Sequence, residues 1–85
     1  MQEKEIGAVS HYFGKVSVGI IELKDSLKIG DTVHIKGAHS DFTQGVDSMQ
    51  IEHQKVEEAK AGDAVGIKVT DKVHEHDKVY KVLEE

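Results

Sequence analysis

The chain contains no cysteine, no arginine and no long apolar run. Without cysteine it can form neither a disulfide framework nor a thiolate metal site, so one small hydrophobic core must hold the fold together. Without arginine it lacks the guanidinium group that binds phosphate or guanine through two parallel hydrogen bonds. No segment approaches the ~20 residues of a membrane span, and the charged start, Met1–Glu5, is unlike a signal peptide. These absences predict a cytoplasmic protein with no membrane partner.

Length and net charge narrow the class further. The 85 residues suffice for one domain with one core, so we expect residues 1–85 to form a single domain. Eleven basic residues, all lysine, against sixteen acidic ones give a formal charge of −5, which repels phosphate backbones at long range. Nonspecific nucleic-acid binding is therefore disfavoured, although a local lysine cluster could still hold one RNA feature.

Apolar and polar residues alternate in short runs, which is the pattern of β-strands. Between Thr32 and Lys36, Val33 and Ile35 face one side while the polar residues face the other, as a half-buried strand requires. Glycine and aspartate separate these runs, and helix-length periodicity is missing. Strands are expected at 6–13, 15–23, 32–36, 45–52, 65–69 and 78–83.

Two segments depart from this alternation. The apolar parity changes within 15–23, which predicts a bulge or bend near Gly19–Ile21. Residues 55–61 have apolar positions three apart and are expected to form one helical turn. The sequence thus predicts an all-β fold, a small closed or partly closed Greek-key-like barrel of about six or seven strands. Its expected core is Val9, Val16, Val18, Ile20, Ile29, Val33, Ile35, Val46, Ile51, Val65, Ile67, Val69, Val79 and Val82.

Three corners of the chain carry an aspartate directly after a residue suited to positive φ. Glycine adopts positive φ without strain, and the aspartate carboxylate can accept backbone hydrogen bonds in such a turn. In the third corner a histidine replaces the glycine, and histidine tolerates left-handed backbone better than most residues. The three pairs are Gly30-Asp31, Gly62-Asp63 and His76-Asp77.

The segments around these corners, 27–37, 46–67 and 73–79, resemble the second domain of translation GTPases of the elongation factor Tu and elongation factor 1-alpha type. The resemblance implies a stand-alone, non-catalytic barrel that contacts RNA (tRNA or rRNA), the ribosome or a translation-associated protein. The G-x-x-x-x-G-K-[ST] phosphate loop is absent, so GTP binding by this chain is not expected. The alternative is an accessory domain that contacts protein and no nucleic acid, because this barrel type also ends unrelated enzymes, including some peptidases.

Candidate contact residues come from three features. The resemblance points to the segment around residue 50, where the tRNA carriers have a charged residue and this chain has neutral Gln50. Lysines on or between adjacent strands could form a positive strip. Aromatic rings could stack on bases, although packing in the core explains most of them as well. The candidates are Met49, Gln50, Glu52, His53, Lys15, Lys28, Lys36, Tyr12 and Phe42.

No catalytic, metal or cofactor site is expected from the remaining polar residues. Ser40 lies between His39 and Asp41, but neighbours along a strand point to opposite faces. His74 and His76 could place two imidazoles on one face, yet a polar turn explains the pair as well. The sequence therefore indicates a binding protein rather than an enzyme.

Overall fold

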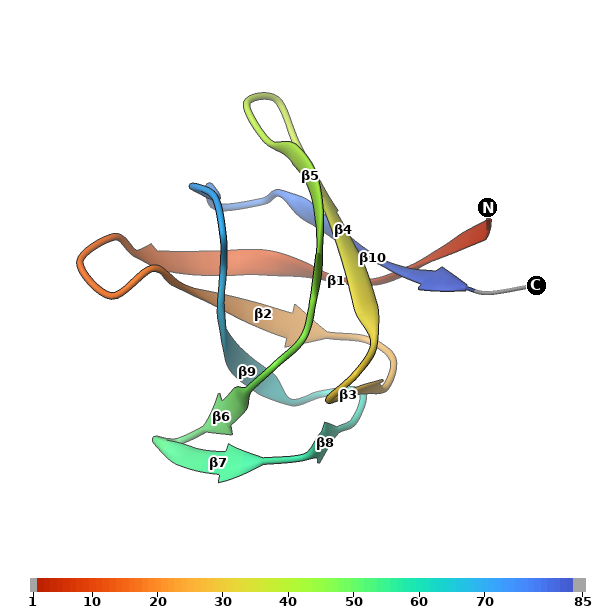
Figure 1. Cartoon of the computed structure of the whole chain (residues 1–85), viewed down its shortest axis with the longest axis vertical. Coiled ribbons are helices and arrows are strands. Elements are labelled where there is room, and N and C mark those ends of the chain that lie inside the picture. The colour runs from red at the N-terminus through yellow and green to blue at the C-terminus, as the bar shows by residue number, and fades with distance from the viewer. Residues whose placement is uncertain (1, 84–85) are drawn as a thin grey trace.

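A computed structural model describes residues 2–83, and these form ten β-strands and no helix. Eight strands make one antiparallel sheet in the order β5-β4-β10-β1-β2-β9-β6-β7, and β3 pairs with β8 separately (Figure 1). None of the described residues forms a helix that could cross a membrane. The strands are β1 (Gln2–Phe13), β2 (Val18–Leu23), β3 (Leu27–Lys28), β4 (Thr32–Lys36), β5 (Asp41–Gly45), β6 (Met49–Ile51), β7 (Gln54–Val56), β8 (Glu58–Ala59), β9 (Ala64–Lys68) and β10 (Lys78–Leu83).

The prediction of an all-β fold is confirmed, whereas the prediction of a closed or partly closed barrel of six or seven strands is wrong. The large sheet has eight strands, and its edge strands β5 and β7 do not pair with each other. The sheet nevertheless curves enough to bring β5 close to the end of β9. Gln44 joins them, because its Nε2 donates to the carbonyl of Lys68 at 2.7 Å and its Oε1 accepts from the Thr70 N–H at 2.7 Å.

The largest difference from expectation lies between residues 45 and 61. The single strand expected at 45–52 is interrupted at 46–48, and the helical turn expected at 55–61 is replaced by β7 and β8. The cause is a tight two-residue turn between β6 and β7, in which Glu52 and His53 have φ of 51° and 66°. Such turns normally carry Gly, Asn or Asp, so the sequence gives no signal for this hairpin.

The three aspartate corners form as the sequence predicts. In each, the carboxylate accepts a hydrogen bond from the backbone N–H three residues earlier, at 2.9–3.0 Å. The residue before the aspartate has positive φ every time, 97° at Gly30, 94° at Gly62 and 75° at His76. The histidine therefore does take the left-handed conformation that glycine takes in the other two corners.

Val33, Ile35, Val65, Ile67 and other expected core residues are buried, but two expectations fail. Val16 is 59% exposed and Ile29 is 37% exposed, because each lies in a turn outside the strands. Four more of the expected core residues, Val18, Ile20, Ile51 and Val82, are only half-buried. The core residues that the sequence interpretation missed are Ile6, Ile21, Leu23, Leu27, Met49, Ala59 and Val73.

The bulge predicted near Gly19–Ile21 lies on the neighbouring strand instead. Val9 pairs with Ile21 and His11 pairs with Ile20, so the extra residue is Ser10 of β1. Strand β2 therefore keeps one parity, in which Ile21 faces the core. The parity change arises because half-buried Val18 and Ile20 lie on the opposite face of a regular strand, so the prediction of a bulge in this segment is wrong.

Candidate functional site

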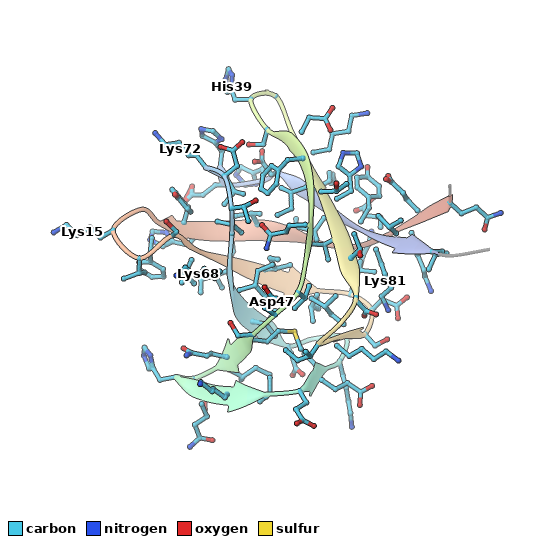
Figure 2. All side chains as sticks on the ribbon, viewed as in Figure 1. Lys15, His39, Asp47, Lys68, Lys72 and Lys81 are labelled. Carbon is cyan, nitrogen blue, oxygen red and sulfur yellow. The ribbon has the colours of Figure 1, made fainter. Side chains whose placement is uncertain are left out.

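A groove of about 880 Å³ opens between the β3–β8 pair, the β6–β7 hairpin and the link from β5 to β6. Figure 2 shows Asp47 on that link, between β5 and β6. The groove exists because β6 does not continue β5 but turns away to pair with β9. The opposite border of the groove is formed by β3, which pairs with β8. Its lining residues are Lys28, Ile29, Asp47, Ser48, Met49, Lys55, Val56, Glu57 and Glu58.

The groove combines an apolar floor with a charged rim. Met49 is 1% exposed, Val56 is half-buried against the core, and Ile29 is 37% exposed. The rim has two lysines and three acidic side chains, all of them on exposed residues. A few polar groups around an apolar floor are typical of a binding site.

The candidate contact residues around residue 50 lie on the β6–β7 hairpin. The side chain of Met49 is buried and belongs to the core and the groove floor, so it offers little surface to a partner. Gln50 is exposed on β6, and Glu52 and His53 are exposed at the hairpin turn. Of the three candidate lysines, Lys28 lies on the groove rim.

The structure does not bring the other candidates to this site. Lys15 extends from the loop between β1 and β2, at the far end of that hairpin (Figure 2). Lys36 is the last residue of β4, next to the loop that leads to β5 (Figure 1). The three lysines therefore lie at separate places and form no common strip. Tyr12 and Phe42 are half-buried and pack against the core, as the packing alternative predicts.

Most of the groove was invisible to sequence interpretation. Asp47, Ser48, Lys55, Glu57 and Glu58 lie within the segment 46–67 that carried the resemblance, but none of them was among the candidate contact residues. Their proximity depends on the unsignalled hairpin turn and on the pairing of β3 with β8.

The structure does assemble a serine, a histidine and an aspartate, but not as a catalytic triad. Ser40 Oγ lies 3.2 Å from His74 Nδ1, and Asp77 Oδ2 lies 3.8 Å from the same nitrogen. A triad needs the serine and the aspartate on opposite ring nitrogens, so that one orients the ring while the other gives up its proton. Ser40 is also 94% buried, with its hydroxyl 3.2 Å from the Lys72 carbonyl. This cluster closes a loop and offers no exposed nucleophile.

The histidines considered as metal ligands are dispersed. His76 forms the third corner, and the ring nearest to that of His74 is not His76 but His39, at 5.6 Å between ring centres. Across residues 2–83, no three His, Asp or Glu side chains are placed to hold one metal ion.

A second charged cluster joins three strands through His34. Its Nδ1 lies 2.8 Å from Glu3 of β1, and its Nε2 lies 2.5 Å from Asp41 of β5. Ionised carboxylates only accept hydrogen bonds, so both contacts are satisfied when the ring is doubly protonated and donates from each nitrogen. The hydrogen bond with Asp41 raises the pKa of His34, desolvation of its 17% exposed side chain opposes the rise, and Glu3 adds to it. The same hydrogen bond lowers the pKa of Asp41.

The His34 cluster predicts a specific pH dependence of stability. Because the pKa of His34 is higher in the folded than in the unfolded protein, protonation of this ring stabilises the fold. The stabilisation is complete below the unfolded pKa of about 6.5 and is lost as pH rises through the folded pKa. The lowered pKa of Asp41 acts at the acid end, where its contribution is lost as pH falls through the folded pKa of Asp41. We therefore expect His34→Gln to reduce the free energy of unfolding most between about pH 4.5 and 6.5, and less at about pH 9. Urea unfolding of both proteins at these pH values measures the difference, and a deficit that grows toward alkaline pH contradicts the assignment.

Comparisons with known proteins give this geometry a context. No protein-family model matches the chain. The chain is 48% identical over 81 residues to an uncharacterized protease of Methanocaldococcus jannaschii, and 33% identical over 82 residues to a collagenase of Porphyromonas gingivalis. Each match covers 94% of this chain but only 20% and 23%, respectively, of the relative. The chain thus spans about a fifth of the length of these relatives.

Solved structures show the same fold. The C-terminal domain of a protein assigned as a U32 peptidase from Geobacillus thermoleovorans superposes with a TM-score of 0.88, covering 94% of this chain and 93% of that one, at 19% identity. The selenomethionine variant of that domain gives a TM-score of 0.85, over 89% of this chain and 96% of that one, also at 19% identity. At this identity the likeness establishes the fold alone.

These matches overturn the interpretation of the chain as a second domain of translation factors. The relatives along 94% of the chain are named as a protease and a collagenase, not as translation proteins. The elongation-factor role and the RNA and ribosome contacts followed from that resemblance and lose their support with it. The physical reason is that the aspartate corners, although they form, use turn chemistry that is open to any small antiparallel sheet.

Proposed function

We propose that this chain is a non-catalytic accessory domain of a U32-type peptidase, and that it binds polypeptide while cleavage takes place elsewhere. The observation that carries the proposal is the match of nearly the whole chain to about one fifth of proteins named protease and collagenase. A region of that size leaves four fifths of each relative for other parts, including any catalytic centre.

The chemistry of the described residues supports a non-catalytic role. In the Ser40–His74–Asp77 cluster the serine is buried and the geometry is wrong for a triad, and residues 2–83 contain no metal-binding group of three. A peptidase needs an exposed nucleophile with a base, or a metal-bound water, in reach of the peptide carbonyl. The groove, with its apolar floor and charged rim, is the surface that fits a polypeptide instead.

Two measurements on the purified chain test this proposal. Incubation with gelatin or casein is expected to release no new amino termini, whereas immobilised gelatin or casein is expected to retain the chain at moderate salt. Cleavage that disappears in Ser40→Ala would overturn the non-catalytic role. Retention on immobilised tRNA at low salt, with none on either polypeptide, would overturn the polypeptide-binding role.

A further inference from the structure

We propose that the groove beside β7 binds a short extended polypeptide segment, which pairs with the free edge of β7 and rests an aliphatic side chain on Val56 and Ile29, above the buried Met49. The inference deepens the proposed function, on which it rests, by naming the site and the chemistry of the segment. It is carried by three features, namely a free strand edge, an apolar floor and a charged rim.

The first feature is the backbone of β7. This strand ends the order of the large sheet, and within residues 2–83 it pairs only with β6. The two-residue turn makes Ile51 and Gln54 a hydrogen-bonded pair, so Gln54 and Val56 direct their backbone groups toward β6. Lys55, between them, directs its N–H and C=O away from β6, toward the free edge. A strand edge of this kind accepts an added strand through main-chain hydrogen bonds.

Only a short stretch of this edge is free, because Ile29 and β3 pair with the residues that follow β7. The Ile29 N–H donates to the Glu57 carbonyl at 2.9 Å, and β3 then continues along β8. A bound segment would therefore extend the line of β3 past Ile29 to Lys55. On the facing wall, Asp47 lies outside the strands and makes no backbone hydrogen bond of the turn or loop kind with any residue from 2 to 83. Its peptide groups are available to the same segment.

The floor and the rim define the side chains of the segment. In an extended segment alternate side chains point the same way, so one aliphatic side chain can face the floor while its neighbours face the rim. The rim carries the carboxylates of Asp47, Glu57 and Glu58 against two lysine ammonium groups, and the whole chain carries a formal charge of −5. This balance favours a segment with lysine or arginine beside the aliphatic residue.

A titration of the ¹⁵N-labelled chain with three capped hexapeptides tests the site. The first peptide alternates valine with lysine from its first residue, the second alternates valine with glutamate, and the third replaces the valine at position 3 of the first with proline. The lysine peptide is expected to shift the amides of Ile29, Asp47, Ser48 and Lys55. The glutamate peptide is expected to bind about tenfold more weakly, because of the rim charge, and the proline peptide as well, because it loses a main-chain donor.

A matched pair of variants locates the contact. Ile29 and Val16 are both exposed apolar residues in turns, but only Ile29 lines the groove. Ile29→Lys is expected to weaken binding of the lysine peptide at least about tenfold through like-charge repulsion, and Val16→Lys is expected to leave it unchanged. Equal binding of all three peptides, shifts confined to other surfaces, or an unaffected Ile29→Lys variant would each refute the groove.

The outcomes separate this inference from the proposed function. If gelatin or casein retains both wild type and Ile29→Lys equally, polypeptide binding stands and the groove is the wrong site. If no polypeptide binds at all, both proposals fail. If the same amides shift with protein concentration alone and sedimentation shows a dimer, the edge of β7 pairs with a second copy of the chain and the peptide assignment is overturned.

Discussion

Replacing Gly7 with alanine is expected to destabilise the domain by roughly 3 kcal/mol or more, the upper range for an overpacked site. A Cβ on Gly7 would stand 2.3 Å from the carbonyl oxygen of Glu22 and 3.2 Å from the side chain of Ile21. The nearest atom is backbone, and Gly7 pairs with Leu23 in the ladder between β1 and β2. The two strands would have to separate to make room. Urea unfolding followed by circular dichroism measures the loss.

Gly45 provides the matched control for this prediction. It also lies in a strand, but a Cβ there meets no atom within 4 Å, and its φ lies outside the left-handed region. Gly45→Ala is therefore expected to be neutral or to stabilise by about 0.5 kcal/mol, because alanine restricts the unfolded chain more than glycine does. A Gly7→Ala variant as stable as Gly45→Ala would show that β1 and β2 do not approach as closely as described.

Replacing Ile35 with alanine is expected to cost about 3 kcal/mol, whereas the same change at Ile29 is expected to cost less than about 1 kcal/mol. The side chain of Ile35 is fully buried on β4, between Val79 of β10 and Phe42 of β5 in the ladder register. Ile29 is 37% exposed and lies in the turn after β3. Removing three carbons from a packed interior leaves a cavity, while solvent fills the space at a surface.

This pair of variants also tests the sequence interpretation, which assigned both residues to the core. Chemical denaturation of the two proteins under identical conditions gives the two losses directly. Similar losses at both sites would favour the sequence interpretation over the structure. A loss at Ile35 that is several times the loss at Ile29 would support the structure, and would leave Ile29 available as a contact residue of the groove.

If the groove binds polypeptide, the domain has a simple use in a larger peptidase. Backbone pairing at a strand edge recognises extended chains of many sequences, because every residue except proline offers the same N–H and C=O groups. The rim charges then add a preference without demanding one sequence. On the proposed function, such a domain would hold an unfolded substrate near a catalytic centre in another part of the peptidase.

The aspartate corners show both the reach and the limit of local sequence signals. The sequence predicted that Gly30 and His76 take positive φ, and both do. The signal succeeded because a turn is determined by the residues inside it. It misled about ancestry for the same reason, since identical turn chemistry appears wherever short antiparallel strands are joined. Similarity along the whole chain, not the corners, corrected the interpretation.

The sequence alone determined the all-β class, the strands at 32–36 and 78–83, and the three corners, because alternation and turn chemistry act between residues close in the chain. Only the tertiary structure decided that Ile29 is exposed, that Ser10 is the bulged residue and that Lys28 pairs with Glu58 in the β3–β8 ladder. Those features depend on which strands pair and in what register. Pairing energy is spread over contacts between distant residues, so no short stretch of sequence encodes it.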